Sequence, residues 1–299
     1  MKENLNLDQT VVWTALITPL KPSGEVDYDS LLTLLKQQEK ASHGILILGS
    51  TGEALNLSEE EKTRILEFLF KQNLNVPIMC GVPGVHLPTT LEWIKTLETY
   101  PIDAYLMVTP LYSKPGDLGQ YRWFKALLDA STKPSVLYNV PSRAGMPLSL
   151  KAIEKLKNHP LFWGIKEASG SVEEFKKYRK TAPDKKMYSG DDAMMPDFAK
   201  EGAQGLISVA SNSWPQATGH YVRKCLENRL TEEEASLWKK ASDSLFKASN
   251  PVPVKRLLKE ISLIESAHCK LPLHEEDLKN TDQLKEANNL VEKWLQKSC

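Results

Sequence analysis

The sequence lacks the features that would place it on nucleic acid or in a membrane. Its 299 residues include 38 basic and 38 acidic side chains, so it has neither the basic excess of a nucleic-acid binder nor a net charge of either sign. No stretch of about 18 apolar residues occurs, which predicts no transmembrane helix. Residues 1–10 carry no apolar core of a secretory signal, so we expect a cytoplasmic protein.

Cysteine and histidine are few and follow no pattern. The four cysteines lie far apart without a C-x-x-C pair, and the six histidines show no zinc-ligand spacing, so we expect reduced thiols and no metal site. The adjacent acids Asp191 and Asp192 lack a third ligand, which favours a structural or helix-capping role. The glycine-rich signatures of dinucleotide-binding and phosphate-binding loops are also absent.

Short apolar runs alternate with longer amphipathic segments through the first 230 residues. The runs are nearly continuous in hydrophobicity, as is typical of strands buried on both faces. They are Val12–Thr18, Ile45–Gly49, Val76–Gly81, Ala104–Pro110, Ser135–Val140, Phe162–Ala168, Lys186–Gly190 and Gly205–Val209. Eight such strand–helix units predict an α/β fold, a (β/α)8 TIM barrel over residues 1–230, with a doubly wound open sheet as the alternative.

The segments between and after the strands indicate helices. Capping boxes at Ser58 and Thr231 each open an amphipathic segment. Helices are also predicted over Ser171–Lys180 and Pro215–Asn228, from Pro253 in a first turn through Ile264, and over Thr281–Leu295. Because the strand pattern stops near residue 230, we expect a C-terminal helical domain over residues 231–299.

Lys166 is the most informative polar residue. It stands inside an apolar strand, where an ammonium group must be paired or must lose its proton. A desolvated lysine has a lowered pKa, and its free amine attacks carbonyl carbons to form a Schiff base. The alternative is a structural ion pair with Glu167 or Asp191, although adjacent strand residues point to opposite faces.

Other polar residues follow the strand ends, where barrel enzymes carry their chemistry. The turn over residues 49–53 offers backbone amides and hydroxyls that suit a small carboxylate, or it is an ordinary turn. Tyr138 and Tyr112 can relay protons through the Ser50 hydroxyl, or they pack in the core. Arg143 suits a bidentate carboxylate contact, or it is a solvated surface arginine.

Six segments in order resemble the dihydrodipicolinate synthase family, within the pyruvate-dependent class I aldolases that include N-acetylneuraminate lyase. They are Gly-Ser-Thr-Gly-Glu at 49–53, Val-Thr-Pro-Leu-Tyr at 108–112, Tyr-Asn-Val-Pro-Ser-Arg at 138–143, Gly-Ile-Lys-Glu-Ala-Ser-Gly at 164–170, Ser-Gly-Asp-Asp at 189–192 and Asn-Pro-Val-Pro-Val-Lys at 250–255. The resemblance covers almost the whole chain. It implies a lyase that condenses pyruvate with L-aspartate 4-semialdehyde in diaminopimelate and lysine biosynthesis.

The resemblance also implies roles for single residues. Lys166 would form the imine with pyruvate, and Ser50 and Thr51 would hold its carboxylate. Tyr138 would be the central acid and base, with Ser50 and a Tyr112 from a neighbouring subunit completing a proton relay. Arg143 would bind the carboxylate of the semialdehyde. The backbones of Gly190 and Ile207 would line the pocket.

Assembly and regulation follow from the same resemblance. It implies a homo-oligomer, a dimer or a homotetramer built as a dimer of dimers, and no cofactor, because the imine is itself the electron sink.

Many relatives are inhibited by lysine, which binds between two subunits. This chain has Thr89, Leu111 and Val85 or His86 where sensitive relatives have glutamate, tyrosine and asparagine, and Lys62 adds a positive charge there. We therefore predict insensitivity to lysine, although Glu92 or Glu59 could supply a carboxylate.

Two other functions remain open from the sequence. One is a sister aldolase, such as N-acetylneuraminate lyase or a keto-sugar-acid aldolase. Arg143 discriminates against it, because this side chain suits a short second substrate with a carboxylate. The other is a barrel that has lost catalysis and serves as a binding protein, which would have lost Lys166 or Tyr138. Ser50, where this family usually has threonine, is a feature of the lyase relatives.

Overall fold

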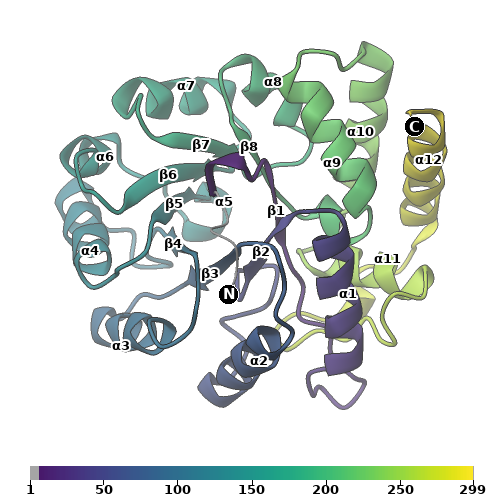
Figure 1. Ribbon diagram of the computed structural model, residues 1–299, viewed down its shortest axis with the longest axis horizontal. Coiled ribbons are helices and arrows are strands. Elements are labelled where there is room, and N and C mark those ends of the chain that lie inside the picture. The colour runs from purple at the N-terminus through teal and green to yellow at the C-terminus, as the bar shows by residue number, and fades with distance from the viewer. Residues whose placement is uncertain (1–6, 299) are drawn as a thin grey trace.

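The computed structural model describes residues 7–298 and shows a closed barrel of eight parallel strands surrounded by helices (Figure 1). Each strand pairs with the next along the chain, and β8 closes the barrel on β1. The strands are β1 Val12–Ala15, β2 Gly44–Ile47, β3 Ile78–Val82, β4 Ala104–Val108, β5 Ser135–Asn139, β6 Phe162–Glu167, β7 Lys186–Ser189 and β8 Gly205–Ser208. The predicted TIM barrel is confirmed, and the open-sheet alternative is wrong.

All eight predicted strands are present, but most end earlier than the apolar runs. β1 ends at Ala15 rather than Thr18, and the Ile17 amide donates to the Asn212 side chain at 3.0 Å instead of to a neighbouring strand. β3 begins at Ile78, and β4 ends before Pro110. Proline has no N–H for the sheet ladder, which explains why Pro77 and Pro110 lie outside the strands.

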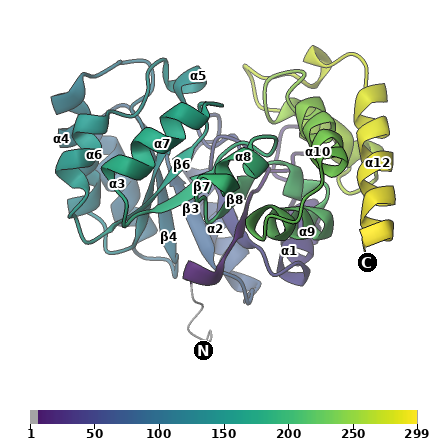
Figure 2. The ribbon, with the colours of Figure 1, turned by 90° about the horizontal axis from the view of Figure 1, so that it is seen from above.

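Helices follow the strands, and all but the short α5, which lies at the carboxyl end of β5, cover the outside of the barrel (Figure 2). They are α1 Tyr28–Lys40, α2 Glu59–Lys71, α3 Leu87–Leu97, α4 Asp117–Asp129, α5 Pro141–Ala144, α6 Leu150–Leu156, α7 Val172–Thr181, α8 Met195–Lys200 and α9 Pro215–Leu226. The predicted capping box at Ser58 is confirmed: its hydroxyl accepts from the Glu61 amide at 3.1 Å, and the Glu61 carboxylate accepts from the Ser58 amide at 2.8 Å. The helix predicted over Pro215–Asn228 ends at Leu226, because Asn228 adopts a left-handed φ of 53°.

Three helices complete the C-terminal part: α10 Glu232–Ser244, α11 Val252–Glu260 and α12 Asp282–Ser298. They lie beside the barrel next to α9, as Figures 1 and 2 show. Trp238 of α10 stacks on Tyr221 of α9 with ring centroids 4.2 Å apart. The extension of α11 to Ile264 is wrong, because Ser262 adopts a left-handed φ of 58° just beyond the helix end.

Two layers of buried side chains make up the core. The larger layer lies between strands and helices, and a smaller cluster fills the barrel, including Trp13, Met79 and Tyr188. Along β6, Ile165 belongs to the outer layer, so alternation turns Lys166 toward the inside. Within residues 7–298, no helix combines the length and the apolar composition that crossing a membrane requires.

Candidate active site

A cavity of about 370 Å³ lies where the carboxyl ends of the strands meet the C-terminal segment. This is the end of a parallel barrel at which enzymes of this fold carry their chemistry. Its wall includes the predicted residues Ser50, Thr51, Tyr138, Arg143, Lys166 and Gly190. The fold therefore brings six of the eight predicted site residues to one place.

Lys166 occupies the floor of this cavity on β6. It is 5% exposed, and its Nζ lies 4.3 Å from the ring centroid of Tyr138 on the neighbouring strand β5. Burial lowers the pKa of Lys166 from its ordinary value of 10.5 to about 7; the Asp192 carboxylate opposes this shift and the Arg143 charge adds to it. A large share of Lys166 is therefore a free amine at neutral pH, which is the nucleophilic form.

The structural ion pair that could have explained Lys166 is not formed within residues 7–298. Glu167 points to the opposite face, where its carboxylate accepts from the Asn139 amide group at 2.7 Å and from the Ser169 backbone at 2.7 Å. Asp191 accepts from the Ala193 amide at 2.9 Å, in the turn that leads to α8. Neither acid neutralises the lysine by contact, so desolvation dominates its pKa.

Gly190 and Asp192 shape the space around Lys166. A Cβ on Gly190 would lie 2.8 Å from the Lys166 Cε, so only glycine leaves room for the lysine side chain. Asp192 is 1% exposed and accepts from the Ser208 hydroxyl at 2.5 Å and from the Val209 amide at 3.0 Å. These bonds confirm the structural role expected of this acid and hold a buried negative charge near the amine.

The turn after β2 carries unused backbone donors. The amides of Glu53 and Ala54 bond to the Ser50 and Gly49 carbonyls, at 3.2 Å and 3.3 Å. Among the residues that the structure describes, the amides of Ser50 and Thr51 have no protein acceptor. Neighbouring free N–H groups in a turn form a concave site for an anion, which suits a small carboxylate.

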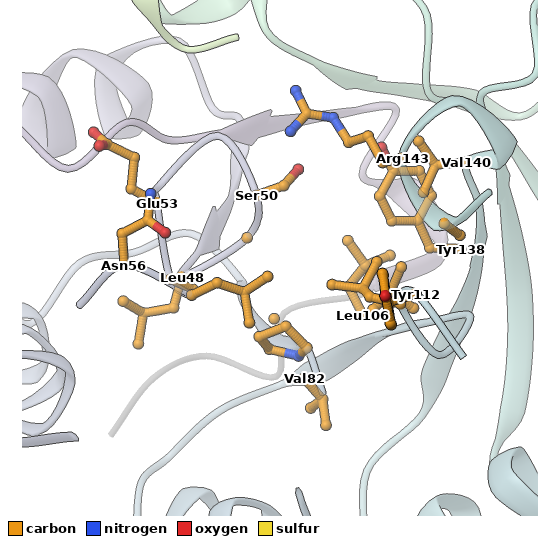
Figure 3. Close-up of a pocket in the computed structure, with 18 of the residues that line it drawn as sticks. Leu48, Ser50, Glu53, Asn56, Val82, Leu106, Tyr112, Tyr138, Val140 and Arg143 are labelled. Carbon is orange, nitrogen blue, oxygen red and sulfur yellow. The ribbon is translucent and has the colours of Figure 1, made fainter. Parts of the chain in front are cut away.

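Tyr138 connects the turn with Lys166. Its phenol is 8% exposed, and burial raises its pKa to about 12, while the Arg143 charge and a hydrogen bond with the Ser50 side chain act in the opposite direction. Tyr138 is therefore a protonated phenol at neutral pH and begins as a donor. Figure 3, a close-up of a larger cavity that adjoins the Lys166 cavity, shows Ser50 pointing toward the side that carries Tyr138 and Arg143, whereas Glu53 points away.

Arg143 lies on the short helix α5, directly after β5. Its guanidinium donates to the Asn250 backbone carbonyl at 3.2 Å, which leaves further donors for a ligand. The residue is exposed and borders the cavity. A partly exposed, tethered guanidinium suits recognition of a carboxylate that enters from solvent.

Tyr112 stands apart from Lys166 within a single chain. It is 94% exposed, has a left-handed φ of 65°, and lines a larger, adjoining cavity of about 840 Å³. Ser50, Tyr138 and Arg143 line both cavities. The other residues of the larger cavity are mostly apolar, including Leu55, Leu111 and Leu273.

The pocket-lining role of the Ile207 backbone stays a prediction, whereas Asn250 lines the cavity although no role was predicted for it. Ile207 is fully buried in the inner cluster and is not among the residues that line the Lys166 cavity. Asn250 lines that cavity and donates to the Thr51 hydroxyl at 2.9 Å. The sequence feature that could have pointed to Asn250 is the segment Asn-Pro-Val-Pro-Val-Lys at 250–255.

No group of three or more metal-ligating side chains occurs within the described part of the chain. The carboxylates of Asp191 and Asp192 accept hydrogen bonds from backbone amides, as described above. The chemistry available at this site is thus that of a desolvated amine, a phenol, a guanidinium and an anion-binding turn.

Comparisons with known proteins identify the family of this chain. Residues 8–290 match the Dihydrodipicolinate synthetase family. A protein of Wolbachia pipientis wMel named 4-hydroxy-tetrahydrodipicolinate synthase is 45% identical over 96% of this chain and 98% of its own. The structure of the synthase from Methylacidiphilum fumariolicum SolV is similar with a TM-score of 0.90 at 30% identity, covering 96% and 97% of the two chains.

A second similar structure was determined with a ligand bound. The chloride-inhibited dihydrodipicolinate synthase from Acinetobacter baumannii, determined in complex with pyruvate, matches with a TM-score of 0.87 at 32% identity, over 95% of this chain and 99% of that one. Family match, relatives and fold cover nearly the same residues. This chain belongs to the dihydrodipicolinate synthetase family.

Proposed function

We propose that this chain is a 4-hydroxy-tetrahydrodipicolinate synthase, which joins pyruvate to L-aspartate 4-semialdehyde through an imine on Lys166. The observation that carries the proposal is the buried amine with its pKa lowered to about 7, beside a turn whose Ser50 and Thr51 amides have no protein acceptor in the described residues. The close relatives that carry this name cover nearly the whole chain and support it.

The first step forms the imine. The neutral Lys166 Nζ attacks the keto carbon of pyruvate, and the keto oxygen leaves as water after proton transfer. The Ser50 and Thr51 amides receive the pyruvate carboxylate, which places the keto carbon toward the lysine. The Tyr138 phenol, whose pKa is raised to about 12, supplies the proton for the departing oxygen.

The second step forms the carbon–carbon bond. Loss of a methyl proton converts the imine to an enamine, and its carbon attacks the aldehyde carbon of the second substrate. Tyr138 and the Ser50 hydroxyl carry the proton to the new alkoxide. The amino group of the second substrate then attacks the imine carbon, which closes the ring and releases Lys166 as a free amine. The balance is one water lost overall.

Arg143 selects the second substrate. Its free donors bind the carboxylate of L-aspartate 4-semialdehyde at the cavity mouth, while its bond to Asn250 fixes its direction. An aldolase that acts on long sugar acids would not need an arginine at the cavity mouth to bind a short second substrate that carries a carboxylate. The relatives that share 45% and 44% of residues with this chain, both named as synthases, also favour this choice.

Tyr112 completes the relay from a second copy of the chain. Within one chain it is 94% exposed beside a mostly apolar cavity. Leu55, which is 60% exposed, lines the same cavity, and an exposed apolar side chain beside an exposed tyrosine supports a contact surface there. We infer a homo-oligomer, a dimer or a dimer of dimers, in which Tyr112 acts across the interface.

The experiment that tests the reaction is borohydride reduction with pyruvate, followed by mass spectrometry of peptides. We expect one reduced adduct, on Lys166. An adduct on another lysine would contradict the assignment. A coupled assay with pyruvate and L-aspartate 4-semialdehyde tests the second substrate, and N-acetylneuraminate is the comparison substrate. We expect turnover with the semialdehyde and pyruvate, and none with N-acetylneuraminate.

A further inference from the structure

Asn250 joins both carboxylate-binding groups of the site. Its side-chain Nδ2 donates to the Thr51 Oγ1 at 2.9 Å, and its backbone carbonyl accepts from the Arg143 Nη2 at 3.2 Å. The residue is 5% exposed and lines the cavity that contains Lys166. Asn250 thus contacts Thr51, which is proposed to bind pyruvate, and Arg143, which is proposed to bind the semialdehyde.

The side-chain bond fixes the direction of the Thr51 hydroxyl. A hydroxyl that accepts a hydrogen bond from an amide N–H keeps its own hydrogen for another acceptor. With Asn250 as the donor, the Thr51 O–H is free to donate to a carboxylate in the turn. The Asn250 Oδ1 is buried and has no protein partner in the described residues, so the side chain is held by its Nδ2 bond alone.

The backbone around Asn250 is anchored to the same turn. The helix α11 begins two residues later, and its Lys255 forms a fully buried ion pair with Glu53, at the end of the turn. Lys255 also donates to the His268 carbonyl at 2.8 Å, and the Glu53 carboxylate accepts from the Lys270 amide at 2.7 Å. This second attachment fixes the distance between α11 and the turn.

We propose that Asn250 is a positioning residue of the reaction, which orients the Thr51 hydroxyl toward the pyruvate carboxylate and tethers Arg143 for the second substrate. The inference rests on the proposed function, because Thr51 and Arg143 take their ligands from it. The side chain serves the pyruvate subsite only, whereas the backbone carbonyl serves the Arg143 subsite. Substitutions of the side chain therefore separate the two.

The test compares two variants of Asn250. Asn250→Ala removes the donor, and we expect the KM for pyruvate to rise about 3- to 10-fold, with a smaller change for the semialdehyde. Asn250→Asp keeps the shape, but its carboxylate accepts from Thr51 and repels the substrate carboxylate. We expect Asn250→Asp to raise the pyruvate KM more than Asn250→Ala does. If Asn250 served only packing, the isosteric aspartate would be the milder change, and that order would overturn the inference.

A double-mutant cycle identifies the route. Thr51→Val should raise the pyruvate KM, and adding Asn250→Ala to it should change little, because the hydroxyl that Asn250 orients is gone. Fully additive effects would overturn the inference. An unchanged KM in Thr51→Val would refute both the carboxylate role of Thr51 and the action of Asn250 through it. Borohydride trapping on Lys166 would still decide the proposed reaction separately.

Asn288→Ala is the matched control. Asn288 is also a buried asparagine of the C-terminal part, 8% exposed, and accepts from the Trp214 indole at 2.9 Å. We expect this variant to lower the melting temperature without changing either KM. Equal rises of the pyruvate KM in Asn288→Ala and Asn250→Ala would reduce Asn250 to general support of the fold, which would overturn the inference.

Discussion

The buried and the exposed halves of the active site are built differently. Lys166 and Tyr138 come from neighbouring strands and are 5% and 8% exposed. Tyr112 and Arg143 follow strand ends and are exposed, Tyr112 at 94%. The buried half has its partners within one chain, whereas the partners proposed for the exposed half are a second copy of the chain and a second substrate.

This difference separates reactivity from selection. A rigid strand pair sets the pKa of the amine by desolvation, which requires water to be excluded. Groups on loops have little burial to perturb them and act through contact geometry. Damage to the buried half is therefore expected to abolish chemistry. In the exposed half, loss of Arg143 is expected to alter affinity, and loss of the Tyr112 hydroxyl to stop turnover in a way that a partner subunit can restore.

The largest effect is expected from Lys166→Ala. A covalent step cannot be replaced by binding, so turnover should fall by at least about 1,000-fold and pyruvate-dependent borohydride trapping should disappear. Lys185→Ala is the control, since the pKa of Lys185 is also lowered by burial and its Nζ lies 5.2 Å from a ring centroid, that of Phe162. It should keep full trapping. Trapping that survives in Lys166→Ala would place the imine elsewhere.

Arg143→Ala should change affinity for one substrate. A charge-assisted bidentate contact contributes about 2–3 kcal/mol, so the KM for the semialdehyde should rise about 30- to 150-fold, with little change for pyruvate. Steady-state kinetics with each substrate varied in turn measures both constants. Arg122→Ala, an exposed arginine on α4, serves as the control. Equal rises of the KM for both substrates would show that Arg143 supports the fold and does not bind the semialdehyde.

The pH dependence of imine formation should report the buried amine. Only the neutral form attacks, so the single-turnover rate of trapping should rise with pH through about 7 and level off above it, well below the 10.5 of an ordinary lysine. Tyr138, with a pKa near 12, stays protonated throughout and adds no second limb near neutrality. A rate that keeps rising to pH 10 would show that Lys166 is not desolvated.

We expect the smallest effect from the free amino acid lysine, which should not inhibit the enzyme. The Lys62 ammonium lies 4.7 Å from the Trp93 ring centroid and 2.5 Å from the Glu59 carboxylate. The chain's own cation thus engages the acid that could have received a lysine ligand, and a second ammonium about 4 Å away would be repelled. Kinetics with millimolar lysine at limiting pyruvate should show no inhibition. Partial inhibition below millimolar lysine would point to Glu92, which is exposed on α3.

The barrel was predictable because its strands are buried on both faces. Continuous apolar runs bounded by proline and glycine located all eight, and Lys166 stood out as the charged residue within one of them. The same alternation that predicts a strand also separated Lys166 from Glu167. Strand ends were less predictable, because backbone groups such as the Ile17 amide bond to side chains that are distant in the sequence, here that of Asn212.

The contacts that hold the site together were beyond prediction from residue patterns. Asn250 and Thr51 are 199 residues apart, and Lys255 and Glu53 are 202 residues apart. Local propensity and periodicity carry no information about such pairs.

The most direct test of the two-half account is mixing two inactive variants. Tyr112→Phe keeps the buried half, and Lys166→Ala keeps the exposed tyrosine. If each site combines Lys166 of one chain with Tyr112 of its partner, an equal mixture after subunit exchange should recover about a quarter of wild-type activity, because half of the dimers are hybrid and each has one intact site. No recovery after verified subunit exchange would contradict the account and place the complete relay within one chain.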